Sequence, residues 1–213
     1  MKFLINKRFK SSVERTPRVL EVAEAFGLGL SDKEFVIYDG LELEVQPGDV
    51  VYITGQSGSG KSLLLRELAA QMRERGLSVA NIDDVPFEPR PLIDQLGKNM
   101  TDAIRLLSLA GLNDAYLFVR RPAELSDGQK YRFRMAKVME SGAQVWVADE
   151  FTAALDRVTA RVVAHNLQRT ARACGATVLV ATTHMDLKED LQPSLYIDKR
   201  YRERVKVEAL RAA

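Results

Sequence analysis

Alternating and helical patterns of apolar residues divide this chain into a β-rich first part and a second part in which strands and helices take turns. Between 18 and 54, alternating stretches such as LELEV and turn signals at Gly27, Gly40 and PGD predict short antiparallel strands. Strands that alternate with helices indicate a mostly parallel sheet covered on both faces, so the predicted fold class is α/β. Continuous apolar runs predict the strands of that sheet at 50–55, 77–82, 143–148, 176–182 and 195–197.

Helical spacing of apolar residues occurs between these strands. The stretch LLLRELAAQMRERG predicts a helix that stops at Gly76, and a long helix is predicted at 155–173. Three prolines between 86 and 91 interrupt regular structure, and a small helical insert begins there. The insert contains TDAIRLLSLAGLNDAYLF, with Thr101 as the expected N-cap, and a second helix that begins at Ser126.

The most informative stretch is GQSGSGKS at 55–62, which fits the pattern G-x-x-x-x-G-K-[ST]. A glycine-rich turn of this kind lets backbone N–H groups converge on a phosphate chain at the N-terminus of the next helix. Lys61 is expected to reach the β- and γ-phosphates of ATP, and the Ser62 hydroxyl to bind Mg²⁺. The expected nucleotide-binding residues of the loop are Gly55, Ser57, Gly58, Ser59, Gly60, Lys61 and Ser62.

Two acids follow the strand VWVA, at the edge of the sheet where ligands of open α/β folds bind. Asp149 is expected to hold Mg²⁺, directly or through water. Glu150 is expected to act as the general base that orients and deprotonates the attacking water. The alternative is that both acids only cap the next helix. A second acid here favours hydrolysis over phosphate transfer.

Four other stretches resemble the landmarks of ATP-binding cassette (ABC) ATPases. LSDGQ at 125–129 resembles the LSGGQ signature, with Asp127 in place of the middle glycine. FTAALD resembles the D-loop, TTHMD the segment of the switch histidine, and VLEVAEAFGLG the first strand with its adenine-stacking aromatic. The resemblance implies that His184 assists catalysis by hydrogen-bonding the γ-phosphate. It also implies that Phe26 stacks on adenine, and that Ser126, Gly128, Gln129 and Asp156 act at a nucleotide shared with a partner subunit.

The resemblance covers about 19–197 and implies one ABC-type domain with the P-loop NTPase fold. Its expected parts are an antiparallel β part at 18–54, a core at 55–85 and 141–198, a helical lobe at 86–140 and a basic tail at 199–213.

One landmark departs from the family pattern. A glutamine that contacts Mg²⁺ usually follows the strand after the first helix, but here the sequence reads NIDDVPFEP. Asp83 or Asp84 occupies that place, and Gln95 lies farther along. The helical lobe is also short.

Composition adds limits. The chain of 213 residues has a formal net charge of +2, with basic runs near both ends. Its one cysteine, Cys174, excludes an internal disulfide, and no apolar run is long enough to span a membrane. The expected location is therefore the cytoplasm.

In the family, the signature of one subunit completes the site of another, so a head-to-tail homodimer around two ATP molecules is expected. The favoured hypothesis is a non-transport ATPase switch acting on a separate soluble protein or nucleic acid, resembling ABC ATPases that occur with acetyltransferase-like domains. The alternative is the ATP-binding subunit of a transporter with a membrane protein partner. A chromosome-maintenance ATPase is disfavoured because no coiled coil interrupts the chain, and a P-loop kinase is a further possibility.

Overall fold

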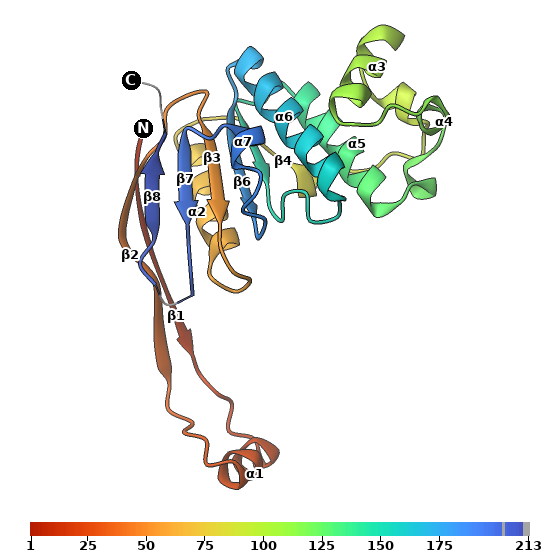
Figure 1. Cartoon of the computed structure of the whole chain (residues 1–213). Coiled ribbons are helices and arrows are strands. Elements are labelled where there is room, and N and C mark those ends of the chain that lie inside the picture. The colour runs from red at the N-terminus through yellow and green to blue at the C-terminus, as the bar shows by residue number, and fades with distance from the viewer. Residues whose placement is uncertain (202, 211–213) are drawn as a thin grey trace. The chain divides into compact units, whose positions relative to one another are not determined.

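The computed structural model describes residues 1–201 and 203–210, and it divides into two compact units. One unit is Lys2–Leu43, and the other comprises Met1 and the chain from Glu44 onward. Most helices and strands of both units are labelled in Figure 1. Within the described part, no helix combines the length and the apolar composition that a membrane span requires.

The larger unit is built on a six-stranded sheet with the strand order β4-β5-β6-β3-β7-β8. The first five strands in this order are parallel, and β8 is antiparallel to β7. Every residue of β3, β5, β6 and β7 is buried, as expected for parallel strands with both faces covered. The strands are β3 (Val50–Thr54), β4 (Val79–Asn81), β5 (Val145–Ala148), β6 (Thr177–Thr182), β7 (Leu195–Asp198) and β8 (Lys206–Ala209).

Helices cover both faces of this sheet. Alternate strand residues, such as Val50 and Tyr52, join a core with α6 (Arg157–Cys174) and α7 (Lys188–Leu191). The intervening residues, such as Val51 and Ile53, are buried as well, and α2 (Lys61–Glu74) packs against β3 and β6 with its own buried leucines. The period-two alternation of a strand therefore sends successive side chains to opposite layers. The α/β prediction is confirmed.

A helical lobe connects β4 to β5. It starts after η1 (Ile82–Asp84) and contains η2 (Leu92–Gln95), α3 (Met100–Leu109), α4 (Ala115–Phe118), η3 (Pro122–Glu124) and α5 (Asp127–Glu140). The N-cap of α3 is Asn99, whose side chain accepts a hydrogen bond from Asp102 N at 3.0 Å. The expectation that Thr101 caps this helix is wrong by two residues, since asparagine caps at least as well as threonine. The predicted start of α5 at its cap Ser126 is correct.

The smaller unit contains β1 (Lys2–Ser11) and β2 (Lys33–Glu44), which pair as a two-stranded sheet, and between them α1 (Pro17–Ala25). The prediction of short strands throughout 18–54 is wrong for α1. The Thr16 hydroxyl accepts a hydrogen bond from Val19 N at 3.3 Å, and Pro17 occupies the first turn of the helix. These local start signals outweigh the apparent alternation of VLEVAEA.

Both basic ends also contain strands that were not predicted. The residues read as a charged N-terminal run form β1, so the assignment of VLEVAEAFGLG to the first strand is wrong. The tail expected at 199–213 contains β8, which pairs with β7. Exposed charged side chains in both strands hid the strand pattern, because edge strands often carry such residues. Residues 211–213 lie outside the described part of the chain.

Candidate nucleotide-binding site

The loop GQSGSGKS connects the end of β3 to the start of α2, which is the placement that phosphate binding requires. Gly55 begins the loop with φ of +142°, a conformation that is essentially restricted to glycine. A Cβ on Gly55 would lie 1.9 Å from the backbone oxygen of Lys199. The same Lys199 donates its backbone N–H to Thr54 O at 2.9 Å. The loop therefore rests directly on the chain that follows β7.

Lys61 is buried at the base of the loop with 9% of its surface exposed. Its Nζ donates a hydrogen bond to the backbone oxygen of Gln56 at 2.7 Å, so the side chain connects the end of the loop to its beginning. Burial lowers the pKa of the Lys61 ammonium, while the charges of Asp149 and Glu150 raise it in part. The charges of Asp149 and Glu150 therefore both act on the Lys61 ammonium. A bound phosphate chain would interact with the ammonium more strongly than either carboxylate does.

Ser62 and Asp149 meet across the sheet edge. The Ser62 hydroxyl donates to Asp149 Oδ1 at 2.9 Å, and Arg66 reaches Asp149 Oδ2 at 3.8 Å from an arginine side chain that is 79% exposed. Mg²⁺ prefers a few protein oxygens completed by water and phosphate oxygens. The Ser62 hydroxyl and the Asp149 carboxylate fit such an ion. In the described residues, no group of three or more His, Cys, Asp and Glu side chains forms an all-protein metal site.

Glu150 is exposed and stands on strained backbone. Its φ is +45° and that of Thr152 is +61°, both in the left-handed region that non-glycine residues avoid. The backbone N–H of Glu150 donates to Asp149 Oδ1 at 3.0 Å. The Thr152 N–H donates to the hydroxyl oxygen of Tyr131, a residue of α5, at 3.2 Å. The segment with the acids is thereby held to α5, the helix that begins within LSDGQ.

Of the residues considered for the missing glutamine, Asp83 lies beside the acids. Asp83 lies in η1, two residues beyond Asn81, which pairs with Val147, and the charges of Asp149 and Glu150 both act on it. Although Asp83 keeps contact with solvent, the surrounding protein raises the pKa of its carboxyl, and the charge of Asp149 raises it further. Arg134 of α5 opposes this rise. Asp83 therefore interacts electrostatically both with Asp149 and with Arg134 of the helical lobe.

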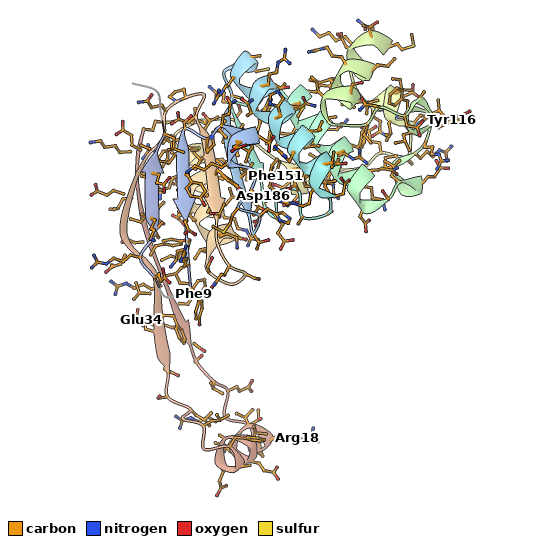
Figure 2. The ribbon with its side chains drawn as sticks, viewed as in Figure 1. Phe9, Arg18, Glu34, Tyr116, Phe151 and Asp186 are labelled. Atoms are coloured by element: carbon orange, nitrogen blue, oxygen red, sulfur yellow. The ribbon has the colours of Figure 1, made fainter. Side chains whose placement is uncertain are left out.

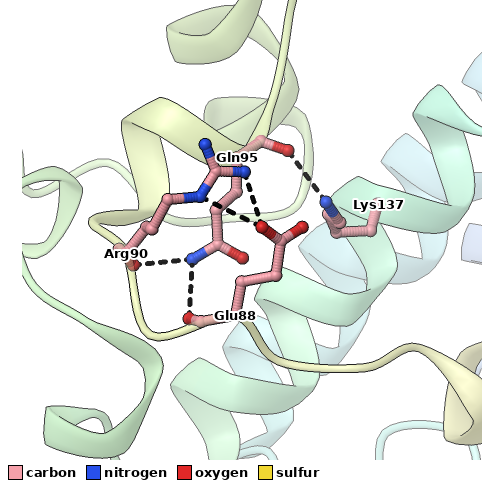
Figure 3. A network of polar contacts seen from close by, with 4 residues as sticks. All are labelled: Glu88, Arg90, Gln95 and Lys137. Atoms are coloured by element: carbon pink, nitrogen blue, oxygen red, sulfur yellow. Dashed lines mark hydrogen bonds and ion pairs between the residues drawn. The ribbon is translucent and has the colours of Figure 1, made fainter.

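Gln95 is instead part of a polar network inside the lobe (Figure 3). Its Nε2 donates to the backbone oxygens of Glu88 at 3.2 Å and Arg90 at 2.6 Å. Its own backbone oxygen accepts from Lys137 Nζ at 2.9 Å. An amide buried in this way shapes the proline-rich connection between core and lobe.

His184 lies in the turn that follows β6. Its backbone N–H donates to Thr182 Oγ1 at 3.2 Å, and its backbone oxygen accepts a hydrogen bond from the hydroxyl of Tyr52. Burial lowers the pKa of the imidazole, and the positive charge of Arg157 lowers it further. Arg157 also forms an ion pair with Asp186, which Figure 2 labels. A neutral imidazole near pH 7 can accept or donate a hydrogen bond.

The signature segment forms a second group of predicted site residues. Ser126 Oγ accepts from Gln129 N at 3.3 Å, and Gln129 Oε1 accepts from Ser126 N at 3.0 Å, which is a capping box. A Cβ on Gly128 would lie 3.1 Å from the backbone oxygen of Ala154, two residues before Asp156. Asp156 caps α6 and accepts from Thr159 N at 3.0 Å and from Thr159 Oγ1 at 2.6 Å. Contacts thus join the segment around Gly128 to the D-loop.

Phe26 is the predicted site residue that the structure places differently. It follows α1 as its C-cap, 76% of its surface is exposed, and it belongs to the unit Lys2–Leu43. Its expected position on a strand is wrong. Its stacking on adenine stays a prediction.

Sequence reasoning missed Tyr52, Tyr131 and Arg157. The position of Tyr52 within the apolar run VVYIT could have indicated its role, because a buried phenol needs a hydrogen-bond partner.

Comparison with known proteins agrees with this geometry. A family model described as "ABC transporter" matches residues 38–85. The cytochrome c biogenesis ATP-binding export protein CcmA of Gluconobacter oxydans is 34% identical over 176 residues, covering 73% of this chain and 77% of that protein. The methionine import ATP-binding protein MetN of Streptomyces coelicolor is 31% identical over 203 residues, covering 75% of this chain but only 56% of its own length.

Solved structures give the same fold. The dimeric ATP-binding cassette MJ0796 in a post-hydrolysis state with ADP and Pi has a TM-score of 0.69 at 18% identity, covering 100% of both chains. The protein cbiO1 of Clostridium perfringens, part of the ABC transporter complex cbiONQ, has a TM-score of 0.61 at 18% identity, covering 82% of each chain.

The favoured functional hypothesis from the sequence is wrong. A switch outside transport, acting on a soluble protein or nucleic acid, is contradicted because the curated relatives are named as ATP-binding proteins of export and import. The expectation of an ATP-hydrolysing enzyme is confirmed. With 34% identity to a relative of which it spans 77%, and with the cassette fold over its whole length, the chain belongs to the ABC family of ATPases.

Proposed function

We propose that this chain is the ATP-binding subunit of an ABC transporter and that its ATP hydrolysis drives a membrane protein partner. The observation that supports this proposal is the named export protein at 34% identity over 73% of the chain. The methionine import relatives point the same way. The likeness to ABC ATPases found with acetyltransferase-like domains has no support among these relatives and stays a prediction. The proposed location is the cytoplasm, next to the membrane partner.

Nucleotide binding would use the loop between β3 and α2. Its backbone N–H groups and the N-terminus of α2 would face the phosphates, and the Lys61 ammonium would exchange its bond to the Gln56 oxygen for phosphate oxygens. Ser62 and Asp149, already in contact at 2.9 Å, would hold Mg²⁺. The ion, when bound, would withdraw charge from the β- and γ-phosphates.

Hydrolysis would use the residues at the ends of β5 and β6. Glu150, exposed and aimed by its left-handed backbone, would orient the attacking water and accept its proton. His184 would donate a hydrogen bond to the γ-phosphate from the turn after β6. Asp83, on which the charges of Asp149 and of Arg134 in α5 act, would replace the usual glutamine in linking the acids to the lobe at 86–140.

Each chain would complete the site of a second copy. The N-terminus of α5, capped by Ser126, would face the γ-phosphate bound by the partner, and Asp156 would lie at the same interface. Two copies would therefore close around two ATP molecules and separate after hydrolysis. Structures with the same fold include a dimeric cassette.

The test of this function combines the trapped state with its partner. We expect Glu150→Gln to bind Mg-ATP and sediment as a dimer, and Lys61→Ala to stay monomeric. From detergent-solubilised membranes of its native cells, tagged Glu150→Gln should retain a multispanning protein in stoichiometric amount. The ATPase rate of the wild-type complex should then respond to the transported compound. Retention of soluble proteins alone, equal for both variants, would contradict the proposal.

A further inference from the structure

Tyr52 is an unusual residue in the central strand of the sheet. Its side chain is fully buried within β3, the strand that leads into the phosphate loop. It pairs in register with Val180 of β6, so its long side chain can extend to the turn that follows β6. A phenol at this depth loses its water and requires hydrogen-bond partners from the protein.

The partner is the His184 turn, residues 184–187. The Tyr52 hydroxyl donates to the backbone oxygen of His184 at the start of the turn. Burial raises the pKa of the Tyr52 hydroxyl, and the backbone N–H of Leu187 at the end of the turn lowers it. One side chain therefore interacts with both ends of the turn. Without such a partner, the backbone groups of a turn at the edge of a core would need water as their hydrogen-bond partner.

The ring of Tyr52 is itself held in place. Its centroid is 5.5 Å from that of Tyr196 on β7, with the planes tilted by 51°. The Tyr196 hydroxyl accepts a hydrogen bond from Thr54 Oγ1 at 2.8 Å, and Thr54 precedes Gly55. On its solvent side the turn is tied to the start of α6 by the ion pair of Asp186 with Arg157. The turn is thus fixed from β3 and from α6.

We propose that Tyr52 is a positioning residue for the proposed hydrolysis: its hydroxyl fixes the backbone of the His184 turn, so that the imidazole meets the γ-phosphate in one orientation. This inference rests on the proposed role of His184. Tyr52 touches neither nucleotide nor metal in this scheme and acts only through the turn. A displacement of about 1 Å at a catalytic group can lower a rate by about a hundredfold, so one missing hydroxyl is sufficient to matter.

The test compares Tyr52→Phe with Tyr196→Phe. Both remove one buried hydroxyl and keep a ring, but only the first frees the backbone of the turn. We expect Tyr52→Phe to lower kcat by about tenfold to a hundredfold and to change the KM for ATP by less than about twofold. We expect Tyr196→Phe to leave the His184 turn unchanged.

A second readout is the NMR titration of the imidazoles. The chain has two histidines, so His165 serves as the reference in the same spectrum. Burial and Arg157 lower the pKa of His184. A loosened turn exposes the ring, so the pKa of His184 should rise toward its ordinary value in Tyr52→Phe.

Equal kcat and equal His184 titration in the two variants would overturn the proposal. Should Tyr52→Phe fail to fold, hydrogen exchange of the wild-type Leu187 amide decides the matter. Slow exchange supports the anchored turn, and exchange as fast as in an open loop overturns it. A wild-type chain without ATPase activity would refute the proposed function, whereas the anchored turn would still be judged by the titration and the exchange.

Discussion

The substitution Gly55→Ala gives the sharpest test of how the phosphate loop is built. The new Cβ would lie 1.9 Å from the Lys199 backbone oxygen, whereas ordinary contact begins near 3.4 Å. The loop and the segment after β7 must therefore separate by about 1.5 Å. Neither side can yield easily, because Lys199 N is hydrogen-bonded to Thr54 O and Lys199 Nζ to the backbone oxygens of Arg200 and Glu203.

The expected cost has two parts. A non-glycine residue at φ of +142° costs about 1 to 3 kcal/mol. Forcing packed backbone apart costs about 1 to 3 kcal/mol more. Gly55→Ala should thus lower the free energy of unfolding by about 2 to 6 kcal/mol. A displaced loop should also weaken ATP binding by about a hundredfold or more.

Gly58→Ala is the matched control within the same loop. Gly58 has φ of +72°, but a Cβ there meets no atom within 4 Å. Its cost should be the backbone strain alone, about 1 to 2 kcal/mol. Urea denaturation gives both stabilities, and titration with a fluorescent ATP analogue gives the affinities. If Gly55→Ala is as stable as Gly58→Ala and binds the analogue as the wild type does, the contact with Lys199 does not shape the loop.

Two further predictions concern other parts of the chain. Gln95→Ala should lower the free energy of unfolding by about 1 to 3 kcal/mol, because the backbone oxygens of Glu88 and Arg90 lose their donor. ATP affinity should persist, and its loss in an equilibrium titration would argue for a direct role at the nucleotide. The hydrogen bond from the Thr159 hydroxyl is the largest of several that lower the pKa of Asp156 below its usual value of 3.8. The carboxylate therefore stabilises the fold above about pH 4 and less as pH falls through the lowered pKa. Asp156→Asn keeps a good N-cap without ionisation. Denaturation curves between about pH 2.5 and 7 should therefore show a stability difference from wild type that is constant above about pH 5 and changes below it. A difference constant over the whole range would contradict the assignment.

Local signals in the sequence were sufficient for the phosphate loop and for the ends of two elements. GQSGSGKS lies between strand and helix as predicted, because Gly55, Gly58 and Gly60 adopt the positive φ angles that this loop requires and that other residues disfavour. Ser126 and Gln129 form their capping box within four residues of chain. The strand before Asp149 is a buried apolar run, which needs no partner to be recognised.

Features set by distant contacts could not be read from the sequence. The turn with His184 is held by Tyr52, which is 132 residues away in the chain. The electrostatic interaction of Asp83 with Asp149 depends on the pairing of β4 with β5, the strands that precede these two residues. β1 and β8 were missed because their charged residues resemble those of a solvated end.

The error about function has a different physical origin. A short helical lobe and an absent glutamine describe the ATPase itself, and neither feature specifies which protein docks on it. Partner choice depends on surface shape and on side chains scattered over several elements. Those determinants form no continuous motif, so relatedness over most of the chain was more informative than any single stretch.

The left-handed backbone conformations of Glu150 and Thr152 imply a trade-off between the stability of this protein and its activity. Each such conformation costs about 1 to 2 kcal/mol for a residue with a Cβ, and Thr152 is β-branched. Random substitutions to glycine or asparagine in this segment would relieve that cost while changing the orientation of Glu150, the proposed general base. Selection for thermal stability alone would therefore favour substitutions in the segment that the proposed catalysis requires. Engineered stabilisation should begin on elements remote from this segment.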